Sequence, residues 1–174
     1  HARVLGSAPD QSAEFLSTIG YLAQAAPPYR RLTVADHLAI GAALNRTWDA
    51  TGLEERMRRL AIPLHRVVGA LSGGQRAQVA LGLALAKRPR LLLLDEPVAA
   101  LDPLARREFL AALAEAVSDG DLTVVMSSHL VHDLERVCDH VILLAAGTTQ
   151  LCDGIEQVLE SHRTLVGPRR AATS

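Results

Sequence analysis

Two adjacent carboxylates follow a short apolar run in the sequence LLLLDEP. The run Leu91–Leu94 is typical of a strand buried on both faces of a parallel sheet, and Asp95 and Glu96 come directly after it. Ligands of such sheets bind outside the carboxyl ends of the strands. Asp95 is therefore a candidate Mg²⁺ ligand, and Glu96 is a candidate general base that activates a water molecule. The alternative is a polar turn that ends a strand.

Other polar residues end neighbouring predicted strands. His129 ends the apolar run LTVVMSSH, and Gln24 ends the earlier run STIGYLAQ. Because the carboxyl ends of parallel strands share one edge of a sheet, His129 is expected to approach the same ligand as Glu96. Taken alone, Gln24 is equally well interpreted as an ordinary polar residue at a strand end, and for an isolated histidine such as His129 that interpretation is favoured.

A glycine pair opens a predicted helix in the sequence LSGGQ. Ser72 and Gln75 have the spacing of a capping box, which satisfies two backbone N–H groups of the first turn. The box does not require Gly73 and Gly74, each of which costs about 1 kcal/mol in a helix relative to alanine. Glycine-rich turns that open helices often bind phosphate, so this loop is a candidate phosphate contact.

The pattern of apolar residues predicts the architecture. Strands alternate with helices at both ends of the chain, while the stretch from about Thr33 to Lys87 reads as helices only. Asp102, directly before Pro103, is expected to cap a later helix. We expect one partial domain over 1–174. Its parts are an α/β core at 1–25 and 89–162, a helical subdomain at about 26–88, and a mobile tail at 163–174. Strands are predicted at 2–6, 17–24, 90–97, 122–129, 140–147 and 148–154, and helices at 33–47, 53–62, 73–87, 102–120, 130–138 and 155–162.

Composition excludes several classes of protein. The net charge is −1, so a basic footprint for nucleic acid is lacking. No apolar run is long enough to cross a bilayer, and no signal peptide is visible. The two cysteines, Cys138 and Cys152, form neither a disulfide framework nor a metal motif, which fits a cytosolic location.

The combination of these motifs strongly resembles the nucleotide-binding subunit of ABC transporters. LSGGQ matches the family signature, and LLLLDE matches the Walker B motif with its catalytic glutamate. AALD at 99–102 matches the D-loop. Gln24 matches the glutamine of the Q-loop, and His129 matches the switch histidine. The resemblance implies an α/β fold of the P-loop NTPase-like, ABC type: a parallel sheet core, incomplete at its N-terminus, with an inserted helical subdomain. The segment 127–151 looks most like bacterial exporters of drugs or lipids, or like subunits with separate permeases.

The resemblance also implies the cofactors, ATP and Mg²⁺, and the roles of individual residues. Asp95 and Gln24 are expected at the metal, and Glu96 and His129 at the reacting water and γ-phosphate. The expected nucleotide contacts are Ser72, Gly73, Gly74, Gln75, Gln24 and Asp102. In this family two nucleotide-binding domains enclose ATP head to tail, so a second domain and a membrane permease are the expected partners. The subunit is then cytoplasmic and peripheral on the inner face of the membrane.

One family motif has no counterpart in the sequence. The phosphate loop G-x-x-x-x-G-K-[ST] (Walker A) is not found, and the only lysine, Lys87, ends a predicted helix. We expect the missing strands and loop to lie upstream of His1 or to be absent, and the chain by itself to bind ATP poorly and hydrolyse none. Two alternatives stay open. One is a truncated interaction or regulatory module without ATPase activity, and the other is a soluble, non-transport ABC ATPase. The interval from Gln24 to Ser72 is too short for the coiled coil of DNA-repair members.

Overall fold

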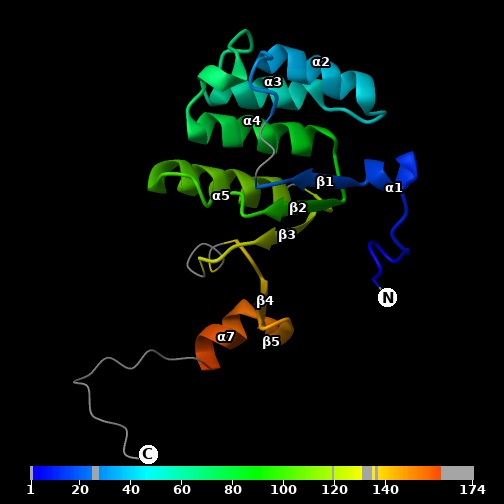
Figure 1. Cartoon of the computed structure of the whole chain (residues 1–174), viewed down its shortest axis with the longest axis vertical. Coiled ribbons are helices and arrows are strands. Elements are labelled where there is room, and N and C mark those ends of the chain that lie inside the picture. The colour runs from blue at the N-terminus through cyan, green and yellow to red at the C-terminus, as the bar shows by residue number, and fades with distance from the viewer. Residues whose placement is uncertain (1, 25–27, 119, 131–134, 136, 162–174) are drawn as a thin grey trace, which may run out of the picture. The chain divides into compact units, whose positions relative to one another are not determined.

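The structure is a computed structural model that describes residues 2–24, 28–118, 120–130, 135 and 137–161 (Figure 1). The chain divides into two compact units, His1–His129 and Leu130–Ser174, and each is described by itself. The predicted mobile tail at 163–174 and most of the predicted helix at 130–138 lie outside the described residues.

The first unit contains a parallel sheet of three strands in the order β1-β2-β3. These strands are β1 (Ile19–Leu22), β2 (Leu91–Asp95) and β3 (Thr123–Ser127). Leu22 pairs with Leu94, and Leu94 pairs with Met126. The carboxyl ends of the strands therefore share one edge, as the alternation of strands and helices predicted.

The two faces of this sheet differ in burial. On one face Leu92 and Leu94 are buried, and Gly20 faces helix α4 so closely that an added Cβ would lie 3.4 Å from the Ala84 carbonyl oxygen. On the other face Tyr21 and Val125 are 61% and 56% exposed. Leu91, which lies on this second face of β2, is 9% exposed, so the prediction that β2 is buried on both faces holds there. It fails at Leu93, which pairs with the exposed Tyr21 and Val125 and is half-buried.

A lobe of helices interrupts the sheet between β1 and β2. It comprises α2 (Val34–Leu44), α3 (Ala50–Arg59), the 3-10 turn η1 (Val68–Ala70) and α4 (Gly73–Ala86). Figure 1 shows α2 and α3 lying next to α4. A buried apolar cluster holds the lobe together, with Val34, Leu38, Leu53, Met57, Ile62, Val68, Leu71, Val79 and Ala86 as its members.

Side-chain caps set the starts of these helices. Thr33 forms a capping box with Asp36 at the start of α2, close to the predicted beginning of that helix. Helix α3 begins at Ala50, earlier than the predicted residue 53, because Asp49 accepts a hydrogen bond from the Gly52 backbone and caps it. The next helix, α5 (Pro103–Ser118), begins directly after Asp102, as predicted.

The first residues differ from prediction. The expected strand at 2–6 is absent from the described structure, where a single bridge joins Val4 and Ser7 around a tight turn. Leu5 and Gly6 have positive φ angles in that turn, so the backbone reverses and does not extend. An unpredicted helix, α1 (Ala13–Ser17), follows and is capped by Ser12, which shortens the strand expected at 17–24.

The second unit contains an antiparallel hairpin and a helix. Strand β4 (His140–Ala145) pairs with β5 (Thr148–Gly154), and Ala146 and Gly147 turn the chain with positive φ angles. Helix α7 (Ile155–Ser161) follows. These three elements lie where the sequence predicted them.

Candidate active site

Four polar residues meet at the carboxyl ends of β2 and β3. The Ser127 hydroxyl donates to Asp95 Oδ1 over 2.9 Å and accepts from the Glu96 backbone N–H, also over 2.9 Å. Beyond it, His129 Nδ1 lies 2.9 Å from Glu96 Oε2. The strand register, which pairs Asp95 with Ser127, brings these residues together from distant parts of the chain.

The backbone of Glu96 adopts an unusual conformation. Its φ is +47°, in the left-handed region that non-glycine residues seldom occupy. Its side chain is only 22% exposed, while that of His129 is 63% exposed. Strained backbone of this kind persists where the surroundings hold it and is common at functional sites. The pair therefore holds a carboxylate in a fixed, half-buried position with an imidazole on its open side.

The donors at this edge are oxygen atoms, the type of ligand that Mg²⁺ takes. Asp95 offers a carboxylate, and the Ser127 hydroxyl adds a further oxygen beside it. Among the described residues there is no group of three or more His, Cys, Asp or Glu side chains that could hold a metal. A protein cage is not needed for Mg²⁺, which is commonly held by one or two carboxylates together with waters and substrate phosphates.

Gln24 follows β1 toward the same edge of the sheet, and among the described residues no hydrogen bond joins it to this group. It sits in an exposed turn shortly after β1, whose last residue, Leu22, pairs with Leu94. Its expected position at the metal therefore stays a prediction.

The signature loop begins α4 as a capping box. The Ser72 hydroxyl accepts from the Gln75 backbone N–H, and Gln75 Oε1 accepts from the Ser72 backbone N–H, each over 3.1 Å. The two glycines differ in surroundings. A Cβ on Gly74 would lie 2.7 Å from Ala105 Cβ on α5, whereas the nearest atom to a Cβ on Gly73 is 4.0 Å away. Close packing of α4 on α5 thus explains Gly74 but not Gly73.

Asp102 lines the same cavity as residues of the signature loop. Its Oδ1 accepts from the Leu104 and Ala105 backbone N–H groups, each over 3.0 Å, which caps α5 as predicted. A cavity of about 220 Å³ is lined by Asp102 together with Ser72, Gly74 and Gln75. In the described part of the chain no hydrogen bond joins this group to the pair Glu96–His129, so the predicted site residues form two separate groups.

Sequence reasoning missed Ser127 and left Lys87 without a role. Ser127 stands two residues before His129, and aligning the ends of the two strands would have placed it opposite Asp95. Lys87 donates to the Leu16 and Ile19 carbonyl oxygens over 2.7 and 2.8 Å, and burial lowers the pKa of its ammonium group. The lysine therefore ties the end of α4 to α1 and β1.

The helices in the described residues are all too short or too polar to cross a membrane. A parallel sheet that carries Asp95, Glu96 and His129 at its strand ends, with a helical lobe that presents LSGGQ, defines a nucleotide-binding domain. The family model described as ABC transporter matches residues 3–99, and the chain belongs to this family.

Curated relatives carry ABC names. The Molybdenum import ATP-binding protein ModC of Aromatoleum aromaticum is 40% identical over 146 residues, which are 81% of this chain and 38% of the relative. The Uncharacterized ABC transporter ATP-binding protein YxlF of Bacillus subtilis is 31% identical over 153 residues, which are 85% of this chain and 51% of the relative. The chain thus spans only about a third to a half of the length of these relatives.

Solved structures share the fold. An ATP binding subunit of an ABC transporter superposes with a TM-score of 0.70 at 25% identity, covering 85% of this chain and 63% of that one. An ATP-binding cassette of another ABC transporter gives 0.70 at 21% identity, covering 83% and 64%. The expected resemblance to export systems is not supported, because the ModC relatives are named for import.

Proposed function

We propose that the chain is part of the ATP-hydrolysing subunit of an ABC membrane transporter. The observation that carries this proposal is that Glu96 contacts His129 beside Asp95 at one sheet edge, where the three side chains could serve as base, orienting group and metal ligand. The names of the ModC relatives favour an import system over an export system. The transported substrate is selected by the permease.

The chain's own residues have distinct tasks in this proposal. ATP with its Mg²⁺ supplies the phosphoryl group that passes to water. Asp95 holds the metal, and its orientation is fixed by Ser127. Glu96 accepts the proton of the attacking water at its carboxylate, and His129 holds that carboxylate through Nδ1. Gln24 lies where it could sense the metal and link the core to the helical lobe.

The signature loop serves a nucleotide held by a second nucleotide-binding domain. In support, Ser72, Gly74 and Gln75 line a cavity together with Asp102, and Glu96 and His129 are not among the residues that line it. No neighbouring atom of the described residues lies closer than 4.0 Å to the position of a Cβ on Gly73. A phosphate group could therefore approach the backbone N–H groups of the first turn of α4. The two groups of site residues then face two different nucleotides across a dimer interface.

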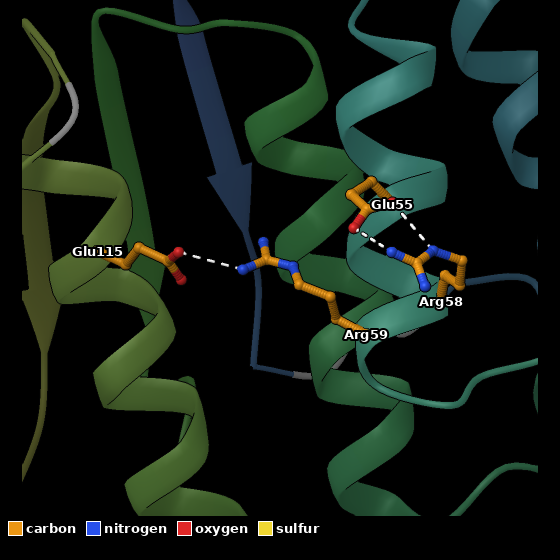
Figure 2. A network of polar contacts seen from close by, with 4 residues as sticks. All are labelled: Glu55, Arg58, Arg59 and Glu115. Carbon is orange, nitrogen blue, oxygen red and sulfur yellow. Dashed lines mark hydrogen bonds and ion pairs between the residues drawn. The ribbon is translucent and has the colours of Figure 1, made fainter.

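The helical lobe offers a surface for the permease. A cleft of about 580 Å³ lies beside α3, floored by Ala61, Ile62, Pro63 and Leu64. The salt bridge between Glu55 and Arg58 lies at its polar rim, where Arg58 Nη2 and Glu55 Oε1 are 2.6 Å apart (Figure 2). Apolar floors with polar rims are typical of docking surfaces. Docking here would hold the subunit on the cytoplasmic face of the membrane.

A second candidate function is a truncated interaction or regulatory module. The sequence contains no G-x-x-x-x-G-K-[ST] loop, and that loop carries most of the phosphate contacts in such sites. A chain that works without it would be an interaction or regulatory module with the same fold and no ATPase activity.

The coding sequence before His1 distinguishes the two. For the ATPase we expect a phosphate loop some tens of residues upstream, and hydrolysis of Mg-ATP by a protein that contains it. Calorimetric titration of the 174-residue chain with Mg-ATP should show no binding in the micromolar range. A reading frame that starts near His1 would favour the module, and micromolar binding by the chain alone would contradict the expected need for the loop.

A further inference from the structure

A third cavity in the first unit shares no residue with the candidate active site. It has a volume of about 210 Å³ and lies between α3, α4 and α5. Leu53 and Ala86, which are 3% and 4% exposed, form part of its apolar floor. The charged groups that line it are Asp49, Arg56, Arg59 and Glu115.

Each carboxylate of this cavity already has an arginine partner. Arg59 on α3 reaches toward Glu115 on α5, and Arg59 Nη1 lies 3.2 Å from Glu115 Oε1 (Figure 2). Asp49 Oδ2 lies 3.1 Å from Arg88 Nη2, while its Oδ1 accepts from the Gly52 backbone N–H. These two pairs are neutral as units, so neither carboxylate is left over to balance a further cation.

Arg56 is that further cation. Its Nη2 donates to Gln78 Oε1 over 2.6 Å, and Gln78, which is 4% exposed, is a neutral amide. Arg56 Nε is buried and has no hydrogen-bond partner among the described residues, and none of their carboxylates lies within ion-pair distance of this guanidinium. Burial lowers the pKa of Arg56, the positive charge of Arg59 lowers it further, and Glu115 acts in the opposite direction.

We propose that this cavity binds a small oxyanion of about the size of phosphate, with Arg56 and Arg59 as its ligands. A half-buried guanidinium without a counter-ion is costly, and an oxyanion supplies both the missing charge and acceptors for the unpaired N–H groups. The cavity is also lined by small residues, Gly52, Gly82, Ala112 and Ala116, beside Arg56 and Arg59. Glu115 is 54% exposed, so its carboxylate can turn toward solvent as the anion takes its place beside Arg59.

Such an anion would join the helical lobe to the α/β part of the unit. Arg56 and Arg59 lie on α3 in the lobe, and the opposite wall is formed by α5, which follows β2. Binding to the folded chain alone raises its stability by mass action. The site would therefore make the stability of this unit depend on the concentration of oxyanion.

Thermal unfolding tests the proposal with inorganic phosphate as the probe. The midpoint is measured in sodium phosphate and in sodium chloride at equal ionic strength, for the unchanged chain, Arg56→Gln and Arg58→Gln. We expect phosphate to raise the midpoint of the unchanged chain by about 3 °C. Arg58→Gln is the matched control, because Arg58 lies on the same helix, pairs with Glu55 and does not line this cavity. It should keep the full shift, and Arg56→Gln should lose it.

A second variant covers the case in which Arg56→Gln does not fold. Ala112→Glu places a carboxylate inside the cavity, and it should raise the midpoint in chloride and abolish the response to phosphate. Calorimetric titration with phosphate should give the same order of variants. The proposal is overturned if phosphate has no effect on the unchanged chain. It is also overturned if Arg56→Gln or Ala112→Glu responds as strongly as the unchanged chain, because the phosphate would then sit elsewhere, such as at the signature loop.

Discussion

His129 Nδ1 lies 2.9 Å from Glu96 Oε2, although the two residues belong to different strand ends. The contact orients the Glu96 carboxylate on its solvent-exposed side. The left-handed backbone conformation of Glu96 sets the direction in which the side chain leaves the chain. In the proposed ATPase an imidazole in this position orients the base and does not replace it. The arrangement leads to predictions that separate orientation, metal binding and folding.

Replacing the imidazole should slow hydrolysis. In a protein that carries the phosphate loop, His129→Ala is expected to lower the rate of ATP hydrolysis about a hundredfold, because Glu96 loses its orienting partner. Single-turnover hydrolysis with saturating Mg-ATP measures this loss. His140→Ala removes an exposed histidine in the second unit and should leave the rate unchanged. Equal rates for His129→Ala and the unchanged protein would exclude the orienting role.

Removing the Ser127 hydroxyl should weaken metal binding. It donates to Asp95 Oδ1 and accepts from the Glu96 backbone N–H, so Ser127→Ala releases both groups at once. Loss of such a supporting contact commonly lowers metal affinity about tenfold or more. The Mg²⁺ concentration that gives half-maximal hydrolysis should rise by about that factor. Ser118→Ala, which removes a hydroxyl bonded only within α5, is the control, and an equal Mg²⁺ requirement in both variants would contradict the prediction.

The two glycines of LSGGQ should respond differently to alanine. Gly74→Ala is expected to destabilise the fold by about 1–3 kcal/mol, because its Cβ would meet Ala105 Cβ at 2.7 Å. Gly73→Ala meets no neighbour closer than 4.0 Å, so it should be neutral or should stabilise the helix by up to about 1 kcal/mol. Urea unfolding measures both changes. If Gly74→Ala is as stable as Gly73→Ala, the packing of α4 on α5 is looser than the structure shows.

The cap of α3 should make stability depend on pH in the acid range. The Gly52 backbone N–H, and after it Arg88, lower the pKa of Asp49 in the folded chain. A carboxyl whose pKa is lowered on folding stabilises the fold above its unfolded pKa of about 4, and this contribution is lost as pH falls through the lower, folded pKa.

Asp49→Asn isolates this charge. It should cost on the order of 0.5 kcal/mol at pH 7, because the site is partly exposed and the amide still caps the helix. The difference from the unchanged chain should shrink as the pH falls below about 4. Urea unfolding at several pH values checks this, with Asp139→Asn, whose side chain is 99% exposed, as the control. A difference that persists unchanged at pH 2 would rule out the ionised carboxylate as its source.

Much of this site could be predicted because its residues carry local signals. Asp95 and Glu96 follow an apolar run, and Ser72 and Gln75 have capping-box spacing, so neither inference needs the tertiary fold. The approach of His129 to Glu96 follows from the rule that parallel strands end at one edge. Their proposed roles in chemistry, like that of Gln24, stay predictions.

The features that were missed depend on contacts between distant segments. Ser127 is one polar residue among several at a strand end, and only the strand register sets it opposite Asp95. Arg56 lies on an ordinary basic helix until α4 and α5 close around it. The prediction of a strand at 2–6 was wrong for a similar reason, because strand formation also depends on distant segments. β-Branched and apolar residues form a strand only where a neighbouring strand pairs with them.

In the proposed ATPase, Glu96 activates the water that attacks ATP. The most direct measurement compares the hydrolysis rate and the ATP affinity of Glu96→Gln with those of the unchanged protein, both carrying the phosphate loop. We expect the rate to fall at least a hundredfold while the dissociation constant for Mg-ATP changes less than about threefold. A variant that binds ATP equally well and hydrolyses it at the original rate would show that Glu96 is not the base.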